Sequence, residues 1–209
     1  GGQDQRRHHP AELSGQNEQK LKVGDMILPI YLYGSEVLRQ KAAPVDLSEK
    51  GKITRLVADM EETLAKSEGC GLAAPQVGES VRVLIVDGTG MTDVYPYLAD
   101  FKRVMINPVI LEESEKKCEY SEGCLSIPGV YCDVTRPQSM TVEYYNGDFE
   151  KVTETFDKFA CRMVQHEMSH LDGDLFVDHV APIRKKIISK KLQNIAKGKV
   201  FARYATKIK

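Results

Sequence analysis

The strongest periodic pattern in the chain lies between residues 48 and 68. Apolar side chains recur there at intervals of three and four residues, which is the spacing of one buried face of an α-helix. Ser48 can cap the start of this helix and Gly69 can end it, so the pattern predicts a helix over residues 48–68. The apolar positions are Ile53, Leu56, Val57, Met60 and Leu64.

Two further helices are predicted near the C-terminal end of the chain. The first covers about four turns, with Asp157 as its N-cap and Gly173 as its stop. The second covers residues 182–197 and is followed by Gly198. Its apolar residues are expected on one side of the helix, at Ile183, Ile187, Ile188, Leu192 and Ile195.

Short runs rich in β-branched residues predict strands between the first helix and the second. The clearest run, residues 81–87, reads Val-Arg-Val-Leu-Ile-Val-Asp, which suits a buried strand. Asn146-Gly147 joins two alternating runs and is a strong signal for a β-hairpin. The other predicted strands cover residues 104–106, 109–115, 117–119, 139–145 and 149–156.

The order of these elements lacks the βαβ alternation of a doubly wound sheet. It predicts an α+β fold in which several short, mostly antiparallel strands pack around a central helix, with one helix in the N-terminal half and one at the C-terminus. Residues 23–200 are expected to form a single domain between a disordered tail at residues 1–22 and a C-terminal tail at residues 201–209. Residues 88–102 mix Gly, Pro, Asp and Thr and are expected to form a surface loop.

Composition and charge narrow the class of protein. The 209 residues are 42% hydrophobic and carry a net charge of −1, so nothing draws the whole chain towards nucleic acid or a membrane. No apolar run approaches the roughly 20 residues of a membrane-spanning helix. Residues 1–20 have too few apolar positions for a secretory signal, and the five unevenly spaced cysteines favour reduced thiols. Together these features predict a cytoplasmic protein.

Positive charge gathers near the C-terminus. The solvated face of an amphipathic helix is the more common origin of such a cluster, and a transient contact with the ribosome or another anionic partner is the functional alternative. The basic residues are Arg184, Lys185, Lys186, Lys190, Lys191, Lys197 and Lys199.

Residues 165–173, Gln-His-Glu-Met-Ser-His-Leu-Asp-Gly, carry the clearest chemical signature. His166 and His170 stand four apart, so both imidazoles can reach one metal ion from the same face of a helix. Glu167 projects about 100° further round the helix and can act on a metal-bound water. The pattern favours a metal site, and its alternative is a pair of histidines that are merely hydrogen-bonded.

A catalytic metal site needs a third protein ligand and an open position. Upstream, Cys124 lies in the turn-like segment Glu-Gly-Cys-Leu-Ser, and its thiolate would suit zinc or ferrous iron beside imidazole. A small buried hydrophobe is an equally good interpretation of this cysteine from the local sequence. Donors downstream are poorer candidates, because the protease-type spacing is missing and a solvated loop explains the acids. They are Asp172, Asp174, Asp178 and His179.

A third segment, residues 69–78, reads Gly-Cys-Gly-Leu-Ala-Ala-Pro-Gln-Val-Gly. Its glycines permit a ligand to approach the backbone closely, and Gln76 offers an amide donor. A helix C-cap followed by a tight connection is the simpler interpretation of this segment by itself.

Together the three segments resemble the three signature motifs of the peptide deformylases. The family pattern runs Gly-x-Gly-Leu-Ala-Ala-x-Gln, then Glu-Gly-Cys-Leu-Ser, then Gln-His-Glu-x-x-His-Leu-x-Gly. All three occur here in that order, at residues 69–76, 122–126 and 165–173. The resemblance implies a hydrolase that removes the formyl group from the N-terminal formylmethionine of newly made peptides and releases formate.

The resemblance also implies a ligand set and a proton carrier. Cys124, His166 and His170 would hold one divalent metal, which is ferrous iron in cells and can be zinc, nickel or cobalt. Glu167 would take the proton of the metal-bound water and pass it to the departing nitrogen.

Two donors are implied for the developing oxyanion. They are the side-chain amide of Gln76 and the backbone N–H of Leu125. Glu122 and Gln165 would orient the metal ligands and the loop.

For the substrate, the resemblance implies addition of a strand. The peptide backbone would pair with an exposed edge near Cys70 and Gly71 and with the region of Gly123. The methionine side chain would enter an apolar pocket, in which Cys70 replaces the aliphatic residue that is common in the family and serves for packing. The residues implied for this pocket are Cys70, Tyr120, Phe159 and Met163.

A zinc endopeptidase is the main alternative function, because it shares the His-Glu-x-x-His pattern. Such an enzyme normally takes its third ligand downstream, whereas the best candidate here, Cys124, lies upstream. A metal-dependent binding protein without catalysis is the second alternative. Glu167 and Gln76 argue against it, since metal binding alone requires neither.

Overall fold

A computed structural model describes residues 26–209, so the tail predicted at residues 1–22 lies outside the described part. The three α-helices within that range are α1 (Lys50–Ser67), α2 (Lys158–Leu171) and α3 (Pro182–Ala196). The strands are β1 (Ile30–Tyr31), β2 (Gly71–Ala73), β3 (Val83–Asp87), β4 (Lys102–Glu113), β5 (Lys117–Cys124), β6 (Ile127–Pro137), β7 (Ser139–Tyr145), β8 (Lys151–Asp157) and β9 (Thr206–Lys207).

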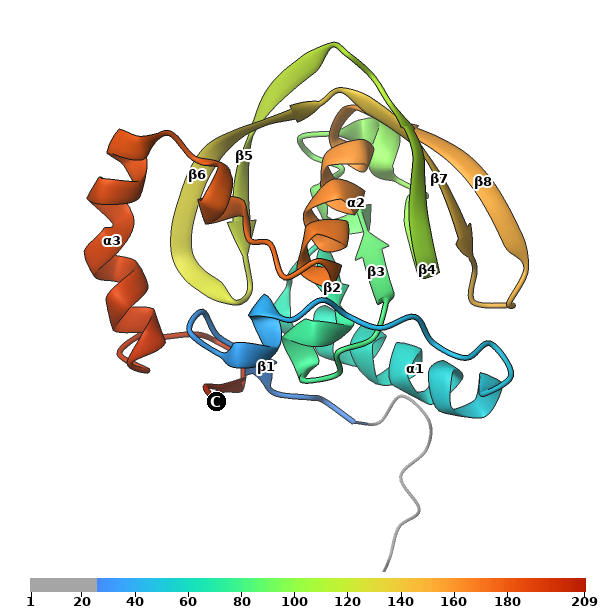
Figure 1. The fold of residues 1–209 in the computed structure, drawn as a ribbon, viewed down its shortest axis with the longest axis horizontal. Coiled ribbons are helices and arrows are strands. Elements are labelled where there is room, and N and C mark those ends of the chain that lie inside the picture. The colour runs from blue at the N-terminus through green and yellow to red at the C-terminus, as the bar shows by residue number, and fades with distance from the viewer. Residues whose placement is uncertain (1–25) are drawn as a thin grey trace, which may run out of the picture.

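These elements form an α+β fold, as predicted. Strands β2, β3, β4, β7 and β8 pair in that spatial order, antiparallel throughout, while β5 and β6 form a separate antiparallel pair. Helix α2 lies at the centre of the molecule between the two sheets, and α3 packs against the far side of β6 (Figure 1). Within the described residues no helix has the length and apolarity needed to cross a membrane.

Strand β3 shows how the five-stranded sheet joins two helices. Its apolar run is buried on both faces, and successive side chains point to opposite sides of the sheet. Leu84 and Val86 pack in the cluster that includes the buried face of α2, whereas Val83 and Ile85 pack with α1. A third apolar cluster joins β6 to α3 and to the 3₁₀ turn Phe176–His179.

The hairpin predicted at Asn146-Gly147 is confirmed, because β7 and β8 pair with Tyr145 opposite Lys151. Its turn is longer than two residues: the Asn146 N–H donates to the Glu150 carbonyl at 3.0 Å, and Phe149 takes a positive φ of 62°. The second strand therefore begins two residues later than predicted.

Strand β6 is absent from the strands predicted by sequence. Pro128 and Gly129 at its start conceal the alternation that follows, in which Val130, Cys132 and Val134 are buried. The segments predicted at residues 104–106 and 109–115 are one strand, β4, with one register shift between them and another between Ile110 and Glu112.

Both ends of α1 differ slightly from the prediction. Glu49 occupies the N-cap position, and the Ser48 hydroxyl donates instead to the Asp46 carboxylate at 2.7 Å. At the other end Glu68, rather than Gly69, takes the left-handed conformation, with φ 59°. Helix α2 ends as predicted, because Gly173 has φ 74° directly after its C-cap.

The single apolar face predicted for α3 is wrong in part. Ile188 and Ile195 are buried, but Ile183 and Ile187 are 73% and 63% exposed. At 100° per residue these two lie roughly 80° or more round the helix from the buried pair, so they cannot reach the same surface.

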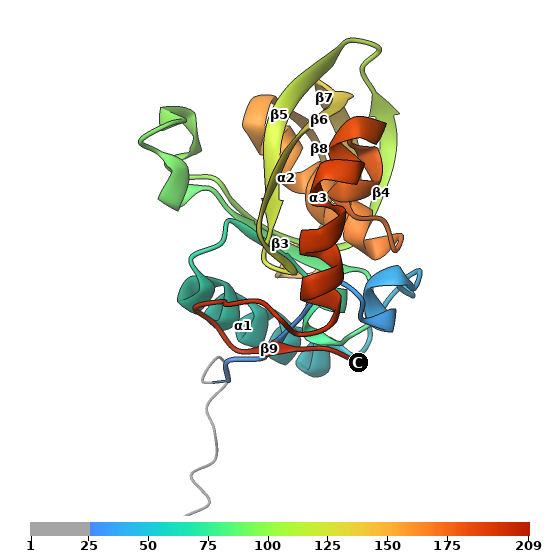
Figure 2. The ribbon, with the colours of Figure 1, turned by 90° about the vertical axis from the view of Figure 1, so that its left-hand side faces the viewer.

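The C-terminal tail predicted at residues 201–209 is also corrected. Strand β9 pairs in parallel with β1, with Thr206 opposite Ile30. In Figure 2 the chain leaves α3, crosses towards α1 and returns as β9. The last residues therefore belong to the folded part of the molecule.

Candidate metal centre

The three predicted metal ligands lie together. Cys124 ends β5, while His166 and His170 lie one turn apart on α2, and their donor atoms are all within 4.8 Å of one another. The Cys124 Sγ lies 3.3 Å from the His170 Nε2. The packing of β5 against α2 thus brings the cysteine to the histidines, and the interpretation of Cys124 as a mere core residue is not supported.

The protonation of the two imidazoles fits a metal. Burial and the neighbouring His166 lower the pKa of His170 well below its usual value, so its imidazole is neutral at neutral pH. Burial opposes protonation of His166, but hydrogen bonds to Cys124 and Glu122 raise its pKa well above the usual value. A proton held among a thiol and two imidazoles is what a divalent metal displaces, and this donor set suits iron or zinc.

Glu167 lies on α2 beside these donors and is 5% exposed. Among the described residues its Oε2 atom has no hydrogen-bond partner. Burial raises the pKa of this carboxyl to about 7, although the charge of His166 partly offsets the effect. A carboxyl with such a pKa can accept and release a proton at neutral pH.

Gln76 reaches the site from the 3₁₀ turn Ala74–Val77. Its Oε1 accepts the Ala73 N–H at 2.9 Å, and its Nε2 donates to the Ser126 hydroxyl at 3.1 Å and to the Cys124 Sγ at 3.4 Å. The amide is therefore held with its N–H₂ group towards the metal ligands.

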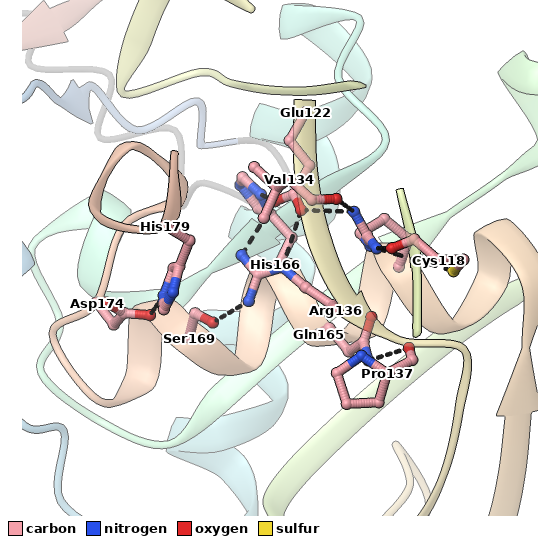
Figure 3. A network of polar contacts seen from close by, with 11 residues as sticks. Cys118, Glu122, Val134, Arg136, Pro137, Gln165, His166, Ser169, Asp174 and His179 are labelled. Carbon is pink, nitrogen blue, oxygen red and sulfur yellow. Dashed lines mark hydrogen bonds and ion pairs between the residues drawn. The ribbon is translucent and has the colours of Figure 1, made fainter. Parts of the chain in front are cut away.

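A buried charge network surrounds the outer side of His166 (Figure 3). The His166 Nδ1 lies 2.8 Å from a carboxylate oxygen of Glu122. The same carboxylate accepts from Arg136 at 2.8 and 3.1 Å and from Arg162 at 3.1 Å. Burial opposes ionisation, but the bonds from His166 and Arg136 lower the pKa of Glu122 to about 2. Glu122 is thus an anion that orients the His166 ring.

Gln165 faces away from the metal ligands. Its side-chain Nε2 donates to the Pro137 carbonyl at 2.9 Å, which joins α2 to the end of β6. Gln165 can therefore influence the site only by fixing the position of the helix.

A cleft of about 810 Å³ opens above these groups. Every predicted catalytic, substrate-binding and metal-binding residue borders it, except Tyr120 and His170. His170 is 1% exposed, so it lies below the surface of the cleft. Tyr120 does not itself border the cleft, and its ring packs edge-on against Phe159, which does, with the ring centres 5.3 Å apart.

Cys70 borders the pocket as expected, and burial raises the pKa of its thiol to about 12. The thiol is therefore protonated at neutral pH, in keeping with the packing role expected for it.

Several residues of the cleft were not predicted. Arg162 stands four residues before His166 and shares its helix face, so helical spacing could have revealed it. Met91, from the predicted surface loop, borders the cleft, and Tyr95 of that loop stacks on Phe159 with ring centres 4.6 Å apart. Tyr131 and residues 201–204 also border the cleft, and no sequence pattern indicated them.

The downstream donors of the protease alternative are occupied elsewhere. His179 pairs with Asp174, and Asp178 accepts from Arg39 at 2.6 Å. Asp172 lies 3.0 Å from a guanidinium nitrogen of Arg82. These pairs explain the acidic loop without a metal.

A thiol and two imidazoles whose donor atoms lie within 4.8 Å of one another, with a carboxyl of raised pKa beside them, are the groups of a metal-dependent hydrolase. Residues 27–186 match the family described as Polypeptide deformylase. The peptide deformylase of Christiangramia forsetii is 42% identical over 186 residues, which are 86% of this chain and 94% of that protein. That of Cytophaga hutchinsonii is 41% identical over 184 residues, 87% of this chain and 97% of that protein.

Solved structures of peptide deformylases have a similar fold. The crystal structure of peptide deformylase from Thermus thermophilus superposes with a TM-score of 0.73 at 35% identity, covering 83% of this chain and all of that chain. Peptide deformylase from Plasmodium falciparum gives a TM-score of 0.73 at 31% identity, over 81% of this chain and 95% of that chain. The chain belongs to the polypeptide deformylase family, whose members are metal-dependent hydrolases that remove the N-formyl group from nascent peptides.

Proposed function

We propose that this enzyme uses Cys124, His166 and His170 as metal ligands and Glu167 as the carrier of the proton during deformylation. The observation that supports the proposal most directly is the position of Glu167. A buried carboxyl with a pKa of about 7 lies next to donor atoms that are within 4.8 Å of one another. When bound, the divalent metal, ferrous iron in the cell or zinc, nickel or cobalt in its place, activates a water molecule as a Lewis acid.

Glu167 takes a proton from the attacking water and returns it to the methionine nitrogen as formate leaves. One carboxyl can serve first as base and then as acid because its pKa lies close to the working pH. Gln76 and the Leu125 backbone N–H donate to the oxygen of the formyl group as negative charge develops on it. The Gln76 bond to the Ala73 N–H supports this role, since it holds the amide nitrogen in a fixed direction.

The peptide backbone binds between two strand edges. Strand β2 is the end strand of its sheet, and β5 belongs to a two-stranded sheet, so each leaves one edge without a partner strand in the described residues. Gly71 and Gly123 border the cleft on these two strands. An extended peptide that pairs with them places its methionine side chain against Cys70, Phe159 and Met163.

Formate release under anaerobic conditions tests the proposal. Metal-loaded enzyme should release one formate from each formyl-Met-Ala-Ser, leave the unformylated peptide intact and leave internal peptide bonds uncut. Treatment with a chelator should abolish release, and added Fe²⁺ should restore it more fully than Zn²⁺. Cleavage of a peptide bond without formate would instead support an endopeptidase.

Cys124→Ser tests the ligand set separately. The hydroxyl is a harder donor than the thiolate, so metal affinity should fall or metal preference should change. Metal content measured by mass spectrometry against free-metal concentration gives the result. An unchanged affinity would remove Cys124 from the set.

We further propose that the enzyme works in the cytoplasm and contacts the ribosome transiently through α3. The basic residues of this helix are exposed and lie among the exposed Ile183 and Ile187. Such a surface suits an anionic partner such as ribosomal RNA. Co-sedimentation with ribosomes should weaken as salt rises and should be lost in a Lys185→Glu, Lys186→Glu variant that keeps its activity on free peptides.

A further inference from the structure

The segment after α3, residues 200–204, is here called the C-terminal strap. It is held at both ends. On one side Val200 packs in the apolar cluster between β6 and α3. On the other side β9 pairs with β1: the Ile30 N–H donates to the Ala205 carbonyl, and the Leu32 N–H donates to the Lys207 carbonyl, each at 2.9 Å. The strap therefore has a fixed course across the molecule (Figure 2).

The strap forms part of the wall of the substrate cleft. Residues 201–204 all border the cleft beside the end of α1. The Tyr204 hydroxyl donates to the Leu125 carbonyl at 2.6 Å, which ties the strap to the residue that follows Cys124. This bond joins residues 79 positions apart, so it is a tertiary contact of the fold rather than a local turn.

The strap and the methionine pocket lie on different apolar clusters. Cys70, Phe159 and Met163 belong to the cluster beneath α2. Leu125 and Tyr204 pack on the other cluster, between the sheet and α1. Because Tyr204 bonds to Leu125 and both border the cleft, a peptide that runs from the methionine pocket towards Leu125 runs beside the strap.

Two large aromatic side chains are left exposed beside this path. Phe201 is 83% exposed and Tyr131 is 66% exposed, and both border the cleft. The Tyr131 ring lies over Gly123, because a Cβ at that glycine would come within 2.5 Å of the ring. Exposed aromatic rings next to a strand edge that accepts a peptide are suited to hold the peptide's apolar side chains.

We infer that the C-terminal strap is the part of the substrate site that selects the residues after the methionine. Phe201 and Tyr131 contact apolar side chains there, and Tyr204 holds the strap in place through Leu125. The inference rests on the proposed function, since it takes the peptide to bind along β2 and β5.

A fluorescent reporter tests the contact directly. The chain has no tryptophan, so Phe201→Trp introduces a single one. In a Glu167→Gln background, which stops turnover, binding of formyl-Met-Leu-Phe to the metal-loaded enzyme should shift the emission to shorter wavelength. Ile183→Trp, an exposed apolar position on α3, is the matched control and should not respond. An unchanged emission wavelength of the tryptophan at position 201, at peptide concentrations that saturate the enzyme, would overturn the inference.

Kinetics provide the second measurement. Phe201→Ala should raise KM for formyl-Met-Leu-Phe by roughly tenfold, the loss expected for one buried apolar contact, with kcat unchanged. KM for formylmethionine alone should not change. Tyr204→Phe, which removes only the hydroxyl, should raise KM for the longer substrate by roughly threefold to tenfold.

The outcomes separate the inference from the proposed function. Equal changes for the short and the long substrate, or none, would refute a role of the strap in selection. Absence of formate release from both substrates by the wild-type enzyme would instead refute the proposed function. Turnover by the Glu167→Gln variant would refute the proton carrier.

Discussion

Two glutamates beside His166 have almost the same burial and opposite properties. Glu122 is 4% exposed and Glu167 is 5% exposed. Three cationic groups hold Glu122, which has a pKa of about 2, namely His166, Arg136 and Arg162. Glu167 has an oxygen without a partner among the described residues, and its pKa is about 7.

The contrast shows that partners, and not burial, decide what a buried carboxyl can do here. Burial raises the pKa of both groups, but only Glu122 has donors that reverse the effect. Glu122 stays ionised and orients a ligand. The pKa of Glu167 is left close to neutral pH, where the carboxyl can exchange a proton.

Glu167→Gln should have the largest effect, because it removes the exchangeable proton and keeps the shape. We expect kcat to fall on the order of a hundredfold to ten-thousandfold. Metal content and thermal midpoint should stay close to those of the wild type. Formate release and metal analysis on the same sample give the answer, with the exposed Glu61→Gln as control. A variant that retains most of its activity would exclude Glu167 as the proton carrier.

Gly71→Ala should also impair the function of Glu167, although the glutamate itself is not substituted. An added Cβ would lie 2.5 Å from the Glu167 Oε1, so the carboxyl must move. A displacement of about 1 Å in a catalytic group can reduce the rate by roughly a hundredfold. Gly51→Ala is the matched control, because a Cβ there meets no atom within 4 Å. Comparable kcat in the two variants would show that the position of Glu167 is not critical.

Glu122→Gln should remove the charge that holds Arg136, Arg162 and the His166 ring in place. It leaves Arg162, which is 1% exposed, without a balancing charge, and removal of one partner of a buried pair destabilises a protein by about 3–5 kcal/mol. Metal affinity should fall by roughly tenfold to a hundredfold, because His166 loses the group that orients it. Urea unfolding and metal titration measure the two effects. Exposed Glu119→Gln should change neither, and a stable variant with normal affinity would contradict the role assigned to Glu122.

The local sequence pattern predicts only some of the residues that make Glu122 and Glu167 differ. The spacing of His166 and His170 requires one helix face, and Glu167 follows from the same helix. Cys124 by itself is ambiguous, because a free cysteine is as often a small core residue, and only the three motifs together point to a ligand.

Arg136, one of the partners of Glu122, could not be predicted in the same way. Arg136 lies on β6, a strand concealed by Pro128 and Gly129 at its start. Its approach to Glu122 depends on the register of β5 with β6, in which Cys132 lies opposite Glu122. Such a register follows from tertiary pairing, which periodicity alone does not specify.

The C-terminal strap illustrates the same limit. Residues 201–209 were expected to form a tail, yet backbone hydrogen bonds to β1 hold the end of this segment. Main-chain pairing of two-residue strands leaves almost no trace in a hydrophobic pattern. Tyr120 shows a further limit: its place beside a motif did not reveal that its ring packs edge-on against Phe159.

A third glutamate, Glu154 on β8, should give the smallest effect of the glutamates compared, and that effect is on stability. Burial opposes ionisation of Glu154, but bonds from Arg103 and Tyr144 lower its pKa below the usual value. Its contribution to stability should therefore be present above the usual glutamate pKa of about 4.3 and disappear as the pH falls through the lower value in the folded protein. For a partly exposed pair we expect about 1 kcal/mol or less. Urea unfolding from pH 7 to pH 3 should show Glu154→Gln less stable than the wild type at pH 7, and the difference should narrow as the pH falls, with exposed Glu112→Gln equal to the wild type throughout. A difference that stays constant as the pH falls would mean that packing, and not ion pairing, accounts for the effect of Glu154 on stability.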